Sequence, residues 1–249
     1  MISVDHLVKD FGARRAVDDV TFEVEKGTVL GFLGPNGAGK STTMRMITGF
    51  IKPTSGTAVI DGHDIITSPV KARSCLGYLP ENAPSYRSMT VYEFLRFMAQ
   101  MRGYKGPNVL SVVDATLEKC FLEDVRNQTI DTLSKGYRQR TCFAQSILHD
   151  PPVLIMDEPT DGLDPNQKHV VREMIKEMAA KKVIILSTHV LEEVDAICNR
   201  VIIISNGKVV KDAKPSELAA EGRLEDVFRR LTTTEDTQVE SEEKEEVTA

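Results

Sequence analysis

The sequence predicts an α/β fold whose parallel sheet carries an antiparallel β edge at the N-terminus and is interrupted by an inserted helical subdomain. Short β-branched runs alternate with longer helical patterns, which is typical of α/β proteins. Three runs, at residues 153–156, 183–186 and 201–204, are continuously apolar. Parallel strands buried on both faces have this composition, so we expect these runs to be buried strands of a parallel sheet.

The other predicted strands lie near the N-terminus, at residues 2–4, 20–24, 29–33 and 57–60. The first strands are separated by short loops such as residues 11–15 and 25–27, which favours antiparallel pairing. Helical patterns follow Lys40, Asp164 and His189. Strands and helices of this kind form an α/β core over residues 1–81 and 151–231.

Residues 82–150 contain helical patterns with no strand run between them. Thr90 and Glu93 have the spacing of a capping box and predict a helix over 91–101. A second helix is predicted over 109–119, and a third begins at Ser134, which is a good N-cap residue. We therefore expect a helical subdomain inserted between the two halves of the core.

Composition excludes several classes of protein. The chain has 249 residues, of which 41% are hydrophobic and 27% charged, as in ordinary globular proteins. No apolar run approaches the ~20 residues that span a bilayer, and the N-terminus lacks a signal-peptide pattern, so we expect a cytoplasmic chain. Its four cysteines are scattered without C-x-x-C pairs, which argues against a zinc site or a disulfide framework.

The net charge of −6 is concentrated in residues 232–249, which carry seven acidic residues and one lysine. This segment is polar and poor in apolar residues, so we expect an acidic disordered tail. Residues 1–231 are then neutral overall, and no nucleic-acid partner is expected.

A phosphate-binding loop follows the strand at residues 29–33. It matches G-x-x-x-x-G-K-[ST], and a helix follows. Its glycines let backbone N–H groups face phosphate oxygens, and the helix N-terminus adds a favourable dipole. Lysine would contact the β- and γ-phosphates and serine would ligate Mg²⁺. The predicted nucleotide-binding residues here are Gly34, Pro35, Asn36, Gly37, Ala38, Gly39, Lys40, Ser41 and Thr42.

Two acidic residues, Asp157 and Glu158, end the apolar strand at residues 153–156. In open α/β sheets, ligands bind at the carboxyl ends of the strands. Asp157 is the predicted Mg²⁺ ligand, and Glu158 would polarise the attacking water. Phosphoryl transfer depends on positioning and charge neutralisation, and these two roles provide both.

A second motif, Leu-Ser-Lys-Gly-Tyr-Arg-Gln-Arg at residues 133–140, lies between the phosphate loop and the acidic strand end. With the phosphate loop it resembles the signature of the ATP-binding-cassette (ABC) ATPases, with Gly136 at that family's middle glycine. The resemblance runs from about residue 1 to residue 231. It implies a P-loop NTPase core, ATP and Mg²⁺ as cofactors, and ATP hydrolysis with Lys40, Glu158 and His189 as catalytic residues.

The resemblance also assigns further site residues. His189 would contact the γ-phosphate, Phe11 would stack on adenine, and Glu81, where the family commonly has Gln, would contact the metal. Ser134 and Gly136 would bind the ATP of a second ATPase subunit. The resemblance therefore also implies that the chain forms a homodimer. Its interface would include Ser134, Lys135, Gly136 and Asp164, although Lys135 stands where Gly is commoner.

A purely structural role remains an alternative for two of these residues. Phe11 could instead pack in the core, as most aromatic side chains do. Asp164, followed by Pro165 and Gln167, could simply cap a helix.

By resemblance, the chain serves an integral membrane permease as a peripheral subunit on the cytoplasmic face of the membrane. The sequence Gly77-Tyr78-Leu79-Pro80-Glu81 resembles export-type members such as gliding-motility and multidrug ATPase subunits. A permease helix would dock near residues 78–104, although the aromatic residues there could also form the subdomain core. The alternatives are a soluble, non-transport ABC ATPase and a non-catalytic regulatory cassette.

Overall fold

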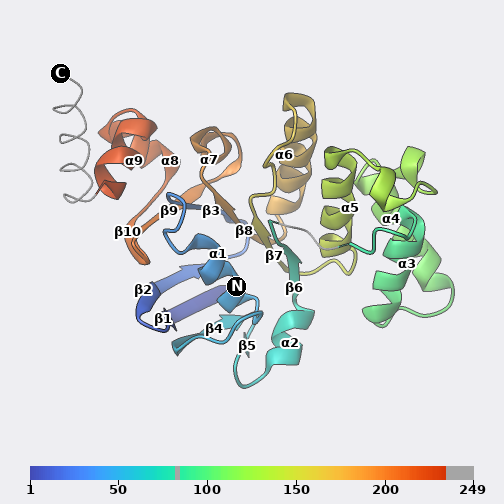
Figure 1. Ribbon diagram of the computed structural model, residues 1–249, viewed down its shortest axis with the longest axis horizontal. Helices are drawn as coiled ribbons and strands as arrows, with labels where there is room; N and C mark the ends of the chain where they lie inside the picture. The colour runs from blue at the N-terminus through green and yellow to red at the C-terminus, as the bar shows by residue number, and fades with distance from the viewer. Residues whose placement is uncertain (82–84, 234–249) are drawn as a thin grey trace.

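Two β-sheets form the centre of the structure, a computed structural model that describes residues 1–81 and 85–233 (Figure 1). The larger sheet has the strand order β10-β9-β3-β8-β7-β6. Its strands are β3 (Val29–Leu33), β6 (Leu76–Leu79), β7 (Val153–Asp157), β8 (Val183–Thr188), β9 (Arg200–Ser205) and β10 (Lys208–Ala213). Pairing is parallel except between β9 and β10. Every residue of β7 and β8 is buried, as are residues 201–204 of β9, which confirms the interpretation of the three apolar runs.

The N-terminal strands form a separate antiparallel sheet of order β2-β1-β4-β5. They are β1 (Ile2–Phe11), β2 (Arg14–Val24), β4 (Ser55–Ile60) and β5 (His63–Asp64). The antiparallel pairing is therefore confirmed. Strand β1 extends seven residues beyond the predicted 2–4, because register shifts and exposed polar residues interrupt its apolar alternation.

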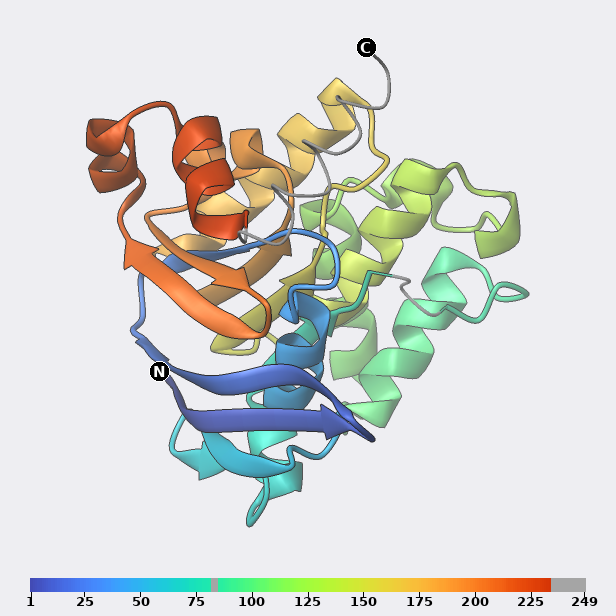
Figure 2. The same cartoon turned by 60° about the vertical axis from the view of Figure 1, so that its left-hand side comes forward.

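Helix α1 (Lys40–Ile47) contacts strands of both sheets (Figure 2). Its side chains Met44, Met46 and Ile47 are fully buried among residues from the two sheets. This packing fixes the start of α1 directly after the phosphate loop. The remaining core helices are α2 (Pro69–Ser74), α6 (Pro165–Ala179), α7 (Leu191–Ile197), α8 (Pro215–Glu221) and α9 (Leu224–Thr232).

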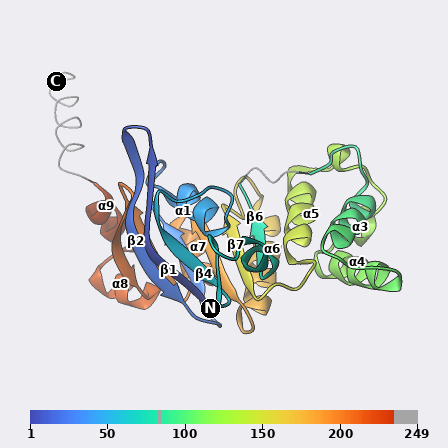
Figure 3. The ribbon, with the colours of Figure 1, turned by 90° about the horizontal axis from the view of Figure 1, so that it is seen from below.

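Helices α3 (Val91–Met101), α4 (Pro107–Lys119) and α5 (Lys135–Ile147) lie together at one end of the molecule, remote from the antiparallel sheet (Figure 3). Short 3-10 turns at Glu123–Val125 and Ile130–Thr132 connect α4 to α5. Thr90 and Glu93 form the predicted capping box, and Ser134 caps α5. These helices pack around Phe94 and Phe143, which are 2% and 1% exposed.

Two predictions concern residues that the structure does not describe. Residues 82–84, where the helical subdomain was expected to begin, lie outside the described residues, as do residues 234–249 of the predicted acidic tail. Within the described part, helix α9 ends at Thr232, and no helix is long and apolar enough to cross a membrane.

Candidate functional site

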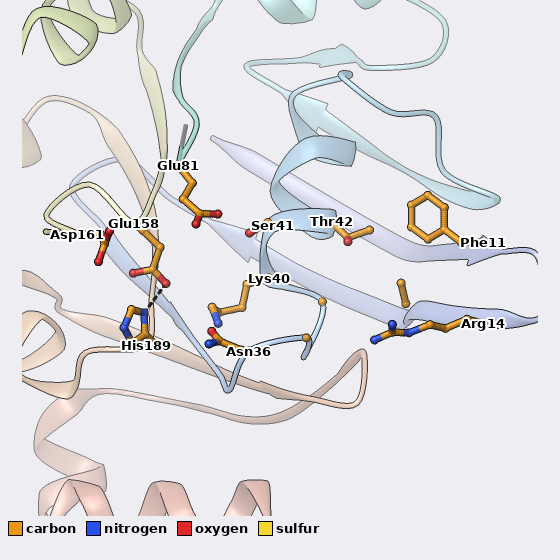
Figure 4. Close-up of a pocket in the computed structure, with 13 residues that line it drawn as sticks. Phe11, Arg14, Asn36, Lys40, Ser41, Thr42, Glu81, Glu158, Asp161 and His189 are labelled. Carbon is orange, nitrogen blue, oxygen red and sulfur yellow. Dashed lines mark hydrogen bonds and ion pairs between the residues drawn. The ribbon is translucent and has the colours of Figure 1, made fainter. Parts of the chain in front are cut away.

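A cavity of about 600 Å³ lies at the carboxyl ends of the parallel strands (Figure 4). Strands β3, β8, β7 and β6 are consecutive neighbours in the sheet. The phosphate loop follows β3, His189 follows β8, Glu158 follows β7, and Glu81 lies just beyond β6. Sheet topology thus brings together residues as far apart in the sequence as Asn36 and His189. The lining residues are Phe11, Arg14, Ala16, Asn36, Gly37, Gly39, Lys40, Ser41, Thr42, Glu81, Glu158, Asp161 and His189.

The phosphate loop requires glycine where it curls. Gly39 caps α1 with φ +105°, and a Cβ there would lie 2.5 Å from the Ala16 carbonyl oxygen. A Cβ on Gly34 would lie 2.5 Å from the carbonyl oxygen of Ile204. Because no side chain caps α1 and its first turn carries no acid, its N-terminal N–H groups are available to an anion. Of the predicted loop residues, Gly34, Pro35 and Ala38 do not line the cavity.

Lys40 is only 7% exposed and folds back over the loop. Its Nζ donates hydrogen bonds to the carbonyl oxygens of Gly34 at 2.6 Å and Pro35 at 3.1 Å. Burial lowers the pKa of Lys40, while the carboxylates of Glu158, Asp157 and Glu81 act in the opposite direction. The site therefore holds a largely desolvated cation at the phosphate loop, where its attraction to phosphate is stronger than in water, while the three carboxylates offset part of its charge.

Asp157 is 1% exposed and is held at its Oδ1 atom. That atom accepts hydrogen bonds from Ser41 Oγ, at 3.1 Å, and from Ser187 Oγ. Its Oδ2 atom is buried without a hydrogen-bond partner among the described residues. A buried carboxylate with a free oxygen beside a serine hydroxyl suits Mg²⁺, which typically takes one or two protein ligands and keeps several waters. The residues at this position thus fit a magnesium ion.

Glu158 and His189 form a pair to one side of the phosphate loop, left of Lys40 and Asn36 in Figure 4. His189 Nδ1 lies 2.9 Å from Glu158 Oε1. The backbone of Glu158 has φ +51°, a left-handed conformation that is uncommon outside glycine. It is held there by a hydrogen bond from its N–H to the Ser187 carbonyl oxygen at 3.1 Å. Residues with strained backbone conformations cluster at functional sites, and Glu158 lines the cavity.

Phe11 lies at the opposite side of the cavity from Glu158 and is 52% exposed. The core-packing interpretation of this residue is therefore wrong. Its ring has the Lys9 ammonium 5.1 Å from its centroid, and its exposed surface can accept a flat base. Arg14 lies beside it across the β1–β2 turn and also lines the cavity.

Three cavity residues were not among the predicted site residues: Arg14, Ala16 and Asp161. Arg14 and Ala16 belong to β2, which packs against the phosphate loop: a Cβ on Gly37 would lie 3.8 Å from Arg14 Nη2, and one on Gly39 would lie 2.5 Å from the Ala16 carbonyl oxygen. Asp161 lies in the loop that follows Glu158. The expected nucleotide contact Thr42 and the expected metal contact Glu81 do reach the cavity, and Glu81 is exposed there.

The signature residues do not reach this cavity. Ser134 and Lys135 are exposed at the start of α5, and Gly136 is buried against the side chain of Gln167. Asp164 caps α6, since its Oδ1 accepts a hydrogen bond from the Gln167 N–H at 2.9 Å. The helix-capping interpretation of Asp164 is thus confirmed.

Comparison with known proteins agrees with this geometry. Residues 17–161 match the family described as "ABC transporter". An ABC transporter ATP-binding protein of Methanocaldococcus jannaschii, MJ1023, is 35% identical over 94% of this chain and 82% of its own length. The ABC transporter ATP-binding protein NatA of Bacillus subtilis is 34% identical over 86% of this chain and 87% of its own.

A solved structure titled as the ATP-binding subunit of an ABC transporter superposes with a TM-score of 0.85 and 31% identity. The similarity covers 94% of this chain and all of that one. Fold, site geometry and relatives therefore agree, and the chain belongs to the ABC transporter family as one of its ATP-binding, ATP-hydrolysing subunits.

Proposed function

We propose that the cavity binds ATP with Mg²⁺ and that the chain uses hydrolysis to drive a membrane permease. The observation that carries this proposal is the convergence of four strand ends on one cavity, which joins the phosphate loop to Asp157, Glu158 and His189. Each group has a role in phosphoryl transfer, where positioning and charge neutralisation dominate.

The phosphate loop and the N-terminus of α1 hold the β- and γ-phosphates, with Lys40 as the charged contact. Ser41 and Asp157, with Glu81 nearby, would hold Mg²⁺, and the ion would supply positive charge that neutralises the phosphates. Glu158 orients the attacking water and accepts its proton, and His189 holds the Glu158 carboxylate in place. Phe11 stacks on adenine, with Arg14 beside it.

A second copy of the chain completes the site in this proposal. The exposed start of α5 presents the Ser134 hydroxyl, which accepts a hydrogen bond from the Tyr137 N–H, and the positive end of the helix dipole, which suits a γ-phosphate. No residue of that segment lines the cavity of its own chain. An ATP-bound homodimer would place Ser134, Lys135 and Gly136 of each subunit over the ATP of the other, with Asp164 at the same interface.

The surface around α3 is the proposed permease contact. Tyr86 is 54% exposed, and its ring centroid lies 5.4 Å from that of Phe97. Phe94, by contrast, is 2% exposed and belongs to the subdomain core. Docking therefore involves Tyr86 and its neighbours, next to the strand end that leads to Glu81. Subdomain 82–150 would then transmit the ATP state to the permease, on the cytoplasmic face of the membrane.

Export is the proposed direction of transport. The Nod factor export ATP-binding protein I of Ralstonia nicotianae is 36% identical over 88% of this chain and 68% of its own length. Export is the activity named for that protein, and the likeness supports an exporter here.

Steady-state phosphate release tests the proposal, measured on purified chain with and without membranes that contain the permease. We expect the purified chain to release phosphate. The permease should change this rate, and the transport substrate should raise it. A soluble ABC ATPase would hydrolyse ATP at a rate that is unaffected by any permease. A regulatory cassette would bind ATP without releasing phosphate. Crosslinking from cysteines placed at Ser85 and Arg87, with Lys208 on another face as control, would locate the contact.

A further inference from the structure

The signature helix holds the loop that follows Glu158 within the same chain. Lys135 Nζ lies 3.3 Å from Asp161 Oδ2, so the two side chains form an ion pair between α5 and this loop. Both side chains remain more than half exposed, at 57% and 55%. Exposed ion pairs are weak and exchange partners readily.

Gly162 makes room for the lysine. A Cβ at position 162 would lie 1.8 Å from Lys135 Nζ and 2.8 Å from its Cε. The lysine side chain therefore crosses directly over the Gly162 Cα, which has φ +63°. The ion pair between Lys135 and Asp161 therefore depends on glycine at position 162, where any side chain would clash with the lysine.

A second contact extends this attachment. Gln139 Nε2, one turn further along α5, donates a hydrogen bond to the Pro159 carbonyl oxygen at 3.1 Å. The loop held in this way begins at Glu158, and Asp161 lines the nucleotide cavity together with Glu158 and His189. A displacement of α5 relative to the core therefore acts on the loop that carries Glu158.

We propose that Lys135 is a two-position switch that exchanges Asp161 of its own chain for the γ-phosphate held by a second copy. This inference rests on the proposed ATP-bound dimer. Lys135 directly follows Ser134, so any anion that approaches Ser134 comes within reach of its flexible four-carbon side chain. In the separate chain, the ion pair with Asp161 is a latch on the Glu158 loop. In the dimer, the ammonium moves to phosphate and releases Asp161.

The exchange couples the two sites of the dimer. When one chain binds ATP, Lys135 of the partner moves from its ion pair with Asp161 to the γ-phosphate of that ATP. This movement frees the partner's Glu158 loop. Because Asp161 and the γ-phosphate compete for one cation, substitutions at the two positions have opposite effects. Loss of Lys135 weakens ATP-dependent dimerisation, whereas loss of the Asp161 charge strengthens it. A latch that served only to stabilise the chain would weaken dimerisation in both cases.

The test measures ATP-dependent dimerisation by sedimentation velocity across an ATP titration. All chains carry Glu158→Gln to suppress hydrolysis, and the added changes are Lys135→Ala, Asp161→Asn, and the two together. We expect the ATP concentration at half-dimerisation to rise about two- to fivefold with Lys135→Ala, and to fall by a similar factor with Asp161→Asn. Lys176→Ala, which breaks an exposed ion pair with Glu173 on α6, should leave it unchanged.

The double variant separates competition from a direct charge effect, since Asp161 could also repel phosphate. If Asp161 acts by holding Lys135, Asp161→Asn has no effect in the Lys135→Ala background. An undiminished Asp161→Asn effect there would overturn the proposal, as would equal shifts in the same direction for both single variants. If the Glu158→Gln parent itself never dimerises with ATP, the proposed dimer fails, and the switch fails with it.

Discussion

Replacement of Glu158 by glutamine should separate ATP binding from hydrolysis. The carboxylate lies at the carboxyl end of β7, 2.9 Å from His189 Nδ1 and beside the phosphate loop. Glutamine has nearly the same shape but cannot accept a proton from water. The hydrogen bond from the residue 158 N–H to the Ser187 carbonyl belongs to the backbone and survives the change. The loop should therefore keep its position.

The expected effect on rate is large. General-base catalysis by a positioned side chain contributes about 10²–10⁴-fold, which corresponds to about 2.7–5.4 kcal/mol in the activation barrier. Binding should change little, or tighten, because the substitution removes one negative charge from the neighbourhood of the phosphates. The Asp157 carboxylate, which is the proposed magnesium ligand, is untouched.

Two assays distinguish these effects. Phosphate release at saturating ATP should fall by at least 100-fold, while a fluorescent ATP analogue should bind within about threefold of the wild-type affinity. Glu173→Gln, an exposed change on α6 remote from the cavity, should leave both values at wild type. Hydrolysis at the wild-type rate in Glu158→Gln would refute the assignment of Glu158 as the base.

Four further outcomes follow from the structure. Lys40→Ala removes the buried cation of the phosphate loop and should weaken MgATP binding about 10- to 150-fold by calorimetry; wild-type affinity would exclude its role. Phe11→Ala should weaken ATP binding about 5- to 150-fold, if stacking contributes about 1–3 kcal/mol, and an unchanged affinity would exclude stacking. Thr90→Ala removes a helix cap and should cost about 0.5–2 kcal/mol in the free energy of unfolding by urea denaturation, in contrast to an exposed change such as Lys176→Ala. Burial lowers the pKa of His149 to about 4 from its usual 6.5, so the unfolded chain binds this proton first and stability falls as pH drops from 6.5 towards 4. His149→Gln should lose less stability than wild type between pH 7 and pH 5, and equal losses would contradict the assignment.

The residues that could be predicted from the sequence belong to local patterns. The phosphate loop is contiguous, and Asp157 and Glu158 directly follow an apolar strand. The capping boxes at Thr90 and Asp164 also depend on spacings of three residues, and both are present. Each of these patterns is determined by neighbours within one turn of helix or one strand end.

The residues that could not be predicted depend on contacts between distant segments. Strand β6 is short and contains Gly77, which lowers its strand signal, yet a Cβ there would lie 2.2 Å from the Ser146 carbonyl oxygen. Close packing of α5 against β6 thus requires glycine at position 77, and the same glycine makes β6 difficult to predict as a strand from the sequence. Arg14 reaches the cavity because β2 packs against the phosphate loop, and Lys135 meets Asp161 across 26 residues. No local pattern encodes either contact.

Mixed-chain complementation tests the central claim, a site shared by two copies, most directly. One chain carries Lys40→Ala and the other Ser134→Arg, and phosphate release is measured for each alone and for an equimolar mixture. We expect neither variant to hydrolyse ATP alone, since each homodimer has two defective sites. The mixture should recover activity, because one site of the mixed dimer combines an intact phosphate loop with an intact signature. Full activity of the Ser134→Arg chain alone would show that one chain contains the whole site, and would contradict the account.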